Sequence, residues 1–341
     1  MTASNKNLFG LMPSGDEVYS YELQNANGMS VKIITFGATV SELKVPSKNG
    51  KSIDVVLGFD SLEGYLQSFQ LAGAPYIGAT VGRYAGRIHN CTFNLNGKQI
   101  LLNKNNNNNS LHGGLVGFSQ KIWTVTNETF GKEPAITLTY TSPANEENYP
   151  GDLTVNVTYT LTEANELKID YSATTTEDTV INLTNHSYFN LDGHSSNVDE
   201  QDLIVNTDEI LEITNEGIPT GRYLQVENTE FNFLSAKKCP SVIDTSFVLH
   251  NKNEFAASLF SKKNNLKMTV FTDQPSVHIY VGGNCSNKIK GKENADYHPL
   301  SGICFETQNF PDAPNQEHFP SAVLKKGEEY THSTAYKFES L

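Results

Sequence analysis

Apolar and polar residues alternate without a break over residues 153–162, which leaves little choice of local structure. A period of two places the apolar side chains on one face of a strand, whereas a helix would scatter them around its axis. Residues 163–166 have the composition of a turn, and residues 167–171 alternate in the same way. The two segments therefore predict an antiparallel hairpin with one buried face.

The same alternation returns in residues 136–140 and 277–281. Asn49-Gly50 and Asn96-Gly97 each separate two strand-like runs, and such dipeptides tolerate positive φ at both central positions of a type I′ turn. No βαβ rhythm and no internal repeat stands out. We predict an all-β chain that forms a large antiparallel β-sandwich with few short helices.

Few segments read as helix or as irregular chain. Asp60 is expected to cap a short helix that runs through Leu66. The asparagine run at residues 105–109 predicts an exposed loop that leads into His112. The segment 309–314 contains two prolines, which cannot continue a central strand, and it predicts a second loop.

Length and charge limit the classes of protein to which the chain can belong. A chain of 341 residues is an ordinary size for one large β domain, so we expect residues 1–341 to form a single domain. The formal net charge of -13 repels phosphate backbones and anionic lipid headgroups, which argues against nucleic-acid and membrane partners. The N-terminal residues are polar and lead into no long apolar run, so we expect a cytoplasmic protein. The sequence leaves the oligomeric state open.

The cysteines show neither the close pairing of a zinc knuckle nor the density of a disulfide scaffold. We expect free thiols, most of them buried, at all four positions: Cys91, Cys239, Cys285 and Cys304.

Two histidines and one carboxylate stand in distinctive segments. His112 lies in Leu-His-Gly-Gly, His186 in Asn-His-Ser-Tyr-Phe-Asn, and Glu306 in Phe-Glu-Thr-Gln. Opening the ring of a free sugar needs a base that takes the proton of the C1 hydroxyl and an acid that protonates the ring oxygen. A carboxylate and an imidazole suit these roles at neutral pH.

Together with the arginine pair in residues 82–88, these segments resemble the aldose 1-epimerases, also called galactose mutarotases. The resemblance runs in order over roughly residues 57–336. It implies the galactose mutarotase-like supersandwich fold, a small monosaccharide as substrate, and no cofactor or metal. The expected activity is the interconversion of the α and β anomers of hexopyranoses such as galactose and glucose.

The resemblance also implies the catalytic residues. Glu306 would be the general base, and His186 would be the general acid. His112 would donate a hydrogen bond to the substrate and steady charge on the ring oxygen, and its share of the acid role stays open. We expect the acid and the base to converge on one hemiacetal carbon from opposite sides.

Three further residues are implied as substrate-binding. Arg87 matches the Arg-Ile pair of the family, and Asp244 matches its sugar-binding aspartate. His278 stands where some members have a substrate-facing glutamine. The family usually follows the aspartate with histidine, whereas this chain has Thr245, so the support of the aspartate is expected to differ. Arg83 is expected to be structural.

Three other functions stay open. Two histidines and a carboxylate also describe non-haem iron sites, although no short His-Xaa-Asp/Glu segment supplies them here. A carbohydrate-binding protein without catalysis would share the fold, since fold alone does not set function. A hexose-6-phosphate 1-epimerase would need cations for the phosphate, and the chain has only three arginines, Arg83, Arg87 and Arg222.

Overall fold

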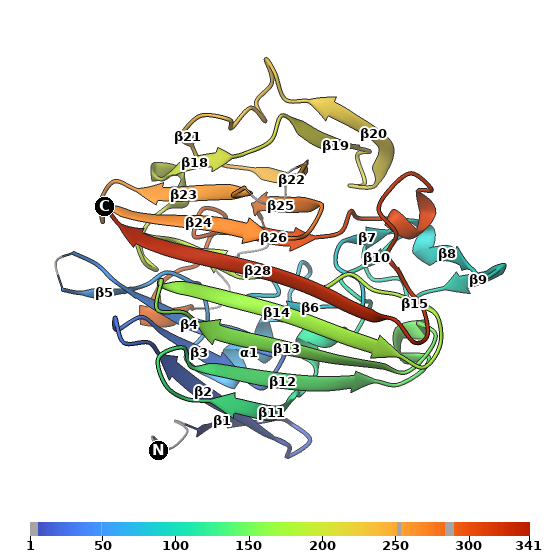
Figure 1. The fold of residues 1–341 in the computed structure, drawn as a ribbon, viewed down its shortest axis with the longest axis horizontal. Coiled ribbons are helices and arrows are strands. Elements are labelled where there is room, and N and C mark those ends of the chain that lie inside the picture. The colour runs from blue at the N-terminus through green and yellow to red at the C-terminus, as the bar shows by residue number, and fades with distance from the viewer. Residues whose placement is uncertain (1–5, 49, 251–253, 284–289) are drawn as a thin grey trace.

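Antiparallel sheets dominate the computed structural model, which describes residues 6–48, 50–250, 254–283 and 290–341 (Figure 1). The largest sheet has nine strands, in spatial order β11 (Thr124–Thr129), β12 (Ala135–Ser142), β13 (Leu153–Leu161), β14 (Glu166–Thr175), β28 (Glu329–Ser340), β24 (Leu266–Thr272), β23 (Ala257–Ser261), β18 (Asp202–Val205) and β21 (Lys237–Lys238). A six-stranded sheet has the order β17 (Tyr188–Phe189), β26 (Ile303–Gln308), β25 (Ser276–Val281), β22 (Ile243–Val248), β19 (Glu209–Ile213) and β20 (Pro219–Gln225).

The N-terminal part of the chain forms a third sheet of five strands in chain order: β1 (Asn7–Leu11), β2 (Glu17–Gln24), β3 (Ser30–Ile34), β4 (Thr39–Pro46) and β5 (Ser52–Asp54). Two-stranded pairings join β6 (Thr80–Val81) to β16 (Thr184–Asn185), β7 (Arg87–Ile88) to β10 (Ser110–Leu111), β8 (Thr92–Leu95) to β9 (Lys98–Leu101), and β15 (Thr179–Val180) to β27 (Val323–Leu324). The described helices are α1 (Leu62–Ser68) and the 3-10 segments His89–Cys91, Phe118–Gln120, Glu146–Asn148, Val198–Glu200, Lys292–Asn294 and Ala313–Asn315. None of the helices in the described ranges is long and apolar enough to cross a membrane.

The predicted hairpin is confirmed as β13 and β14. Every second residue of β13, from Leu153 to Leu161, is buried, and the residues between them are partly exposed. Asn165 takes a positive φ of 59° in the turn, and the two strands pair without a register shift. The strands predicted at residues 136–140 and 277–281 are confirmed within β12 and β25.

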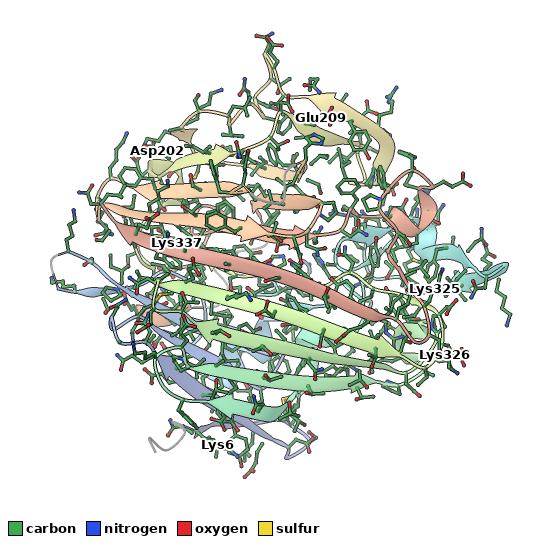
Figure 2. All side chains as sticks on the ribbon, viewed as in Figure 1. Lys6, Asp202, Glu209, Lys325, Lys326 and Lys337 are labelled. Carbon is green, nitrogen blue, oxygen red and sulfur yellow. The ribbon has the colours of Figure 1, made fainter. Side chains whose placement is uncertain are left out.

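The two large sheets pack face to face, which confirms the predicted antiparallel sandwich. Phe305 of β26 and Tyr336 of β28 belong to one hydrophobic core, and the Tyr336 hydroxyl donates to the Phe305 carbonyl over 3.0 Å. The outer face of the nine-stranded sheet is polar, as Lys337 of β28 illustrates in Figure 2. Burial of the apolar faces supplies the main driving force for this arrangement. Because one face of the six-stranded sheet is buried in this core, its opposite face is the one available for a site.

Two local predictions differ in detail from the structure. Helix α1 starts one residue later than expected, because Ser61 is its extended N-cap and accepts a hydrogen bond from the Gly64 amide at 3.4 Å; Asp60 is not the cap. The Asn96-Gly97 turn is confirmed, with φ values of 51° and 75°. Asn49 lies outside the described residues.

The cysteine prediction is confirmed for the described positions. Cys91, Cys239 and Cys304 are free and buried. Cys285 lies outside the described residues.

Candidate active site

Alternation along three neighbouring strands gathers polar side chains on one face of the six-stranded sheet. Glu306 of β26 lies opposite His278 of β25, which lies opposite Ser246 of β22. Asp244 is two residues before Ser246 and shares its face. The residues of opposite parity, Phe305, Ile279 and Phe247, are buried in the core. One face of the sheet is therefore hydrophobic, and the other face carries the polar side chains of the candidate site.

The segment of His112 approaches this face from outside the sheet. Leu111 of β10 pairs with Arg87 of β7, which places His112 directly beyond that pairing. His112 has a positive φ of 52°, and Gly113 follows with a φ of 90°. A Cβ atom on Gly113 would lie 2.0 Å from the Gly82 carbonyl oxygen, so only glycine fits this close approach.

The asparagine run supports the site and is not simply an exposed loop. The Asn105 side chain accepts from the Leu111 amide at 2.7 Å and donates to the Leu111 and Gly114 carbonyls at 2.8 and 2.7 Å. The Asn106 amide oxygen accepts from Arg87 Nε at 3.2 Å. Asn109 is fully buried. A short loop must satisfy its backbone groups, and asparagine side chains do so here.

His186 lies between β16 and β17, where its backbone is bonded on both sides. Its amide donates to the Ala79 carbonyl over 2.9 Å, and its carbonyl accepts from the Gly78 amide over 2.9 Å. The Asn185 side chain donates to the Gly78 carbonyl over 3.0 Å. These bonds to the segment before β6 fix where the imidazole projects.

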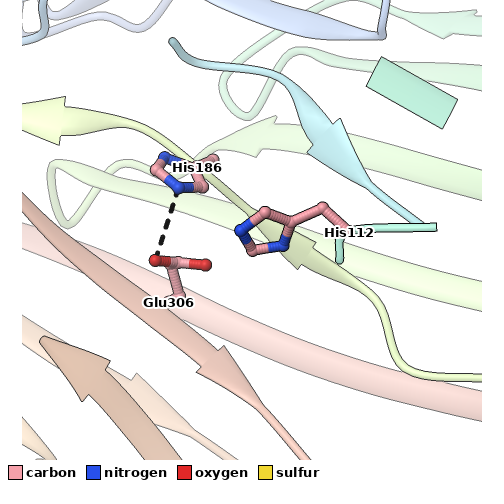
Figure 3. A group of neighbouring side chains, drawn as sticks. All are labelled: His112, His186 and Glu306. Carbon is pink, nitrogen blue, oxygen red and sulfur yellow. Dashed lines mark ion pairs between the residues drawn. The ribbon is translucent and has the colours of Figure 1, made fainter. Parts of the chain in front are cut away.

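His112, His186 and Glu306 meet in one pocket of about 640 Å³, measured with its open mouth, and Arg87 and Asp244 also line it. His186 Nε2 lies 3.5 Å from Glu306 Oε1, and both side chains are buried (Figure 3). No substrate atom fits between these two atoms at that distance, so the imidazole and the carboxylate lie side by side. This corrects the expectation of an acid and a base on opposite sides of the carbon.

The His112 ring is held in one protonation state. Its Nδ1 accepts a hydrogen bond from the Gly86 amide at 3.3 Å, so the neutral ring carries its proton on Nε2. Burial, together with the charges of His186 and Arg87, holds the pKa of His112 well below its usual value. His112 is therefore a neutral hydrogen-bond donor at physiological pH.

Asp244 lies between His278 and Arg87 at the side of the pocket. Its Oδ1 lies 2.8 Å from His278 Nε2, and its Oδ2 lies 3.7 Å from Arg87 Nη2. Desolvation would raise the pKa of Asp244, but the hydrogen bond and charge of His278 and the charge of Arg87 outweigh it and hold the pKa well below its usual range. Asp244 is therefore ionised at neutral pH. The second nitrogen of His278, Nδ1, lies 2.8 Å from Ser246 Oγ.

Sequence reasoning missed several pocket residues. The Tyr76 ring lies 4.8 Å from that of His112 and 5.9 Å from that of His186, measured between centroids. Gln308, two residues after Glu306 on the same face of β26, also lines the pocket. Gln308 Oε1 and Glu306 Oε2 are buried without a hydrogen-bond partner in the protein, and a ligand hydroxyl could satisfy both. The alternation of β26 places Gln308 on the same face as Glu306, and this pattern could have identified Gln308 from the sequence.

Arg83, which was expected to be structural, and Thr245, which was expected to change the support of Asp244, both lie outside the pocket. Arg83 is buried and donates to the Ser142 hydroxyl at 2.6 Å and to the Pro150 and Gly151 carbonyls, which makes it structural as expected. Thr245 lies on the core side of β22, opposite Ile279. Support for Asp244 therefore comes from the neighbouring strand and not from the next residue.

Ligand atoms of His112, His186 and Glu306 lie within 4.8 Å of one another, and these residues form the one group of three or more possible metal ligands found among the described residues. Such a set is compatible with a divalent metal as well as with proton transfer. We retain the prediction of a metal-free site and test it below.

Known proteins resemble the chain over nearly its whole length. The family model described as aldose 1-epimerase matches residues 19–337. Galactose mutarotase of Bos taurus is 40% identical, with 99% of each chain covered, and aldose 1-epimerase of Escherichia coli K12 is 32% identical, covering 96% of this chain and 97% of that protein. The crystal structure of a GalM/aldose epimerase homologue from C. elegans superimposes with a TM-score of 0.85 at 32% identity, over 94% of this chain and 99% of that one. The chain belongs to the aldose 1-epimerase family.

Proposed function

We propose that this protein is an aldose 1-epimerase that interconverts the α and β anomers of a hexopyranose, with galactose and glucose as the leading substrates. Family membership supports the reaction class. The observation that carries the proposal is the pair of His186 Nε2 and Glu306 Oε1, 3.5 Å apart in the pocket. The two oxygens that exchange protons during ring opening are bonded to the same carbon, so adjacent acid and base groups can serve both.

In the proposed reaction, Glu306 takes the proton of the C1 hydroxyl while protonated His186 gives a proton to the ring oxygen. The C1 to ring-oxygen bond breaks and leaves an open-chain aldehyde. Rotation about the bond from C1 to C2 presents the other face of the carbonyl, and reverse transfers close the ring. Each group must therefore act in both protonation states.

The neighbouring groups support this exchange. His112 would donate a hydrogen bond from its Nε2–H group to the ring oxygen and stabilise negative charge that develops there, while the transferred proton comes from His186. Arg87 would donate to sugar hydroxyls, and Asp244 would accept from them. His278 pairs across the sheet with Glu306 and lies next to Asp244.

A hexose 6-phosphate is the less favoured substrate. Arg83 is buried in structural bonds, and Arg222 pairs with Glu212 at the surface with N–O distances of 2.7 Å. Arg87 is the remaining arginine, and no lysine of the described residues lines the pocket. A phosphate would lack the cations that it requires.

Polarimetry of freshly dissolved α-galactose and α-glucose tests the proposal. We expect optical rotation to reach equilibrium far faster with protein than without, and more slowly with glucose 6-phosphate than with glucose. Dialysis against a chelator should leave the rate unchanged, whereas its loss would favour the iron site. Sugar binding without acceleration would instead establish a carbohydrate-binding protein and overturn the proposal.

We also propose that the chain works as a single domain in the cytoplasm. The family match across residues 19–337 supports one domain. The three described cysteines are free and buried, which suits a reducing compartment.

A further inference from the structure

We propose that His278 is a titratable positioning residue that fixes the sugar-binding carboxylate of Asp244, so that sugar binding weakens when the His278 ring loses its proton. The inference rests on the proposed function, because it concerns the same pocket. It gives His278 a role different from the direct sugar contact that the sequence implied.

Both ring nitrogens of His278 already have partners in the protein. Nε2 lies 2.8 Å from Asp244 Oδ1, and Nδ1 lies 2.8 Å from Ser246 Oγ. A histidine ring has no third polar atom with which to bind a sugar hydroxyl. The His278 side chain is 15% exposed, so little of the ring is open to the pocket.

The Asp244 carboxylate needs this support. Its side chain is 42% exposed, and Arg87 lies at the longer distance of 3.7 Å from Oδ2. The terminal torsion of aspartate is soft, and a carboxylate held at one oxygen by a good hydrogen bond keeps the other oxygen in a fixed direction. His278 thereby presents Oδ2 to the pocket beside Arg87, where sugar hydroxyls can donate to it.

Charged and titratable groups face His278 from each neighbouring element: Asp244 on β22, Glu306 on β26, Arg87 on β7 and His112 after β10. Burial disfavours the charged ring, but the hydrogen bond to Asp244 and the charges of Asp244 and Glu306 outweigh burial and Arg87, and they raise the pKa of His278. The charge-assisted bond is therefore complete below the ordinary value of 6.5 and is lost as pH rises through the raised pKa. A charged hydrogen bond is about twice as strong as a neutral one.

Equilibrium binding separates this role from catalysis. We would measure the dissociation constants of galactose and glucose at anomeric equilibrium by calorimetry, from acid to alkaline pH. The wild-type constant should rise as His278 deprotonates, by on the order of tenfold for loss of one charge-assisted bond. The variant His278→Gln can still donate to Asp244 but cannot be charged, so its constant should be closer to the wild-type alkaline value and flat through that transition.

Two further variants sharpen the test. Ser246→Ala removes the acceptor of Nδ1, so the transition should move to lower pH, and NMR titration of the His278 ring should report the same move. His250→Gln alters an exposed histidine that pairs with Glu209 at 3.0 Å, and it should keep the wild-type pH dependence.

Parallel pH dependences in wild type and His278→Gln would overturn the inference, as would an unmoved transition in a folded Ser246→Ala protein. Wild-type protein that binds neither sugar at any pH would instead refute the proposed function. Failure of the one is therefore distinguishable from failure of the other.

Discussion

Individual residues decide the chemistry, and Glu306 gives the sharpest test. Glu306→Gln keeps the size of the side chain but removes the proposed base, so we expect turnover to fall by about 10²–10⁴-fold, with a much smaller change in KM. Polarimetric measurement of kcat and KM would check this. Turnover equal to that of wild type would remove Glu306 from the role of base.

The glycine after His112 tests how closely the backbone must pack. Gly113→Ala forces a Cβ into the Gly82 carbonyl at 2.0 Å and must displace the loop, so we expect at least tenfold lower kcat/KM, about 1.4 kcal/mol. Gly97→Ala is the matched control, since its φ is also positive, at 75°, but nothing lies within 4 Å of an added Cβ. Gly97→Ala should be slightly destabilised and fully active. Equal losses in both variants would show that backbone strain, and not the close approach, explains the effect.

The sequence predicted which residues line the pocket better than it predicted the bonds that hold them in place. His112, His186, Glu306, Arg87 and Asp244 were all expected, and all line one pocket. The bonds of the asparagine run were missed because composition predicts an exposed loop and carries no information on what a side chain bonds.

At the level of whole elements, the loop before β10 is bonded to the segment that carries His112. Asn105→Ala removes three hydrogen bonds that close this loop, each worth about 0.5–1.5 kcal/mol, and should lower kcat/KM by roughly tenfold or more. Asn108→Ala in the same run loses one exposed bond to Lys104 and should stay within about twofold of wild type. Mutarotation rates for the two variants would compare them. Similar rates would contradict a positioning role for Asn105.

The strands could be predicted from the sequence, because the alternation of apolar and polar residues that identifies a strand is a local pattern. The alternation in β13 and the Asn96-Gly97 turn were read correctly without knowledge of the partner strands. The cap of α1 was misplaced by one residue, since Asp60 and Ser61 are both good cap residues and only backbone geometry selects between them.

Across the whole molecule, a buried ionic cluster joins distant segments away from the site. Asp54 Oδ2 lies 2.5 Å from Lys292 Nζ and 3.1 Å from His194 Nε2, and Lys292 also donates to the Ser41 carbonyl at 2.6 Å. Removing one partner of a buried pair leaves an uncompensated charge, so Asp54→Asn should lower the free energy of unfolding by about 3–5 kcal/mol. Urea denaturation at neutral pH would measure the loss. The exposed pair of Arg222 and Glu212 is the control, and Glu212→Gln should change the free energy of unfolding far less than Asp54→Asn does.

The same cluster has a predictable pH dependence. Burial would raise the pKa of Asp54, but the charge of Lys292 and the hydrogen bond of His194 outweigh it and lower the pKa. The contribution of Asp54 is therefore present above its ordinary value of 3.8 and is lost as pH falls through the lowered pKa. The difference in stability between wild type and Asp54→Asn should shrink over that acid range, and a constant difference would contradict the assignment.

The sequence by itself determined the all-β class, the hairpin of β13 and β14, the buried cysteines that are described, and the candidate residues that line the pocket. The first three depend on local period, composition or residue type, and the candidate residues depend on motifs that resemble those of the aldose 1-epimerases. The tertiary structure decided that His186 and Glu306 touch, that His278 spans Asp244 and Ser246, and that Thr245 faces the core. Those contacts depend on which strands pair and in which register, and pairing between distant segments is set by burial of the whole sandwich.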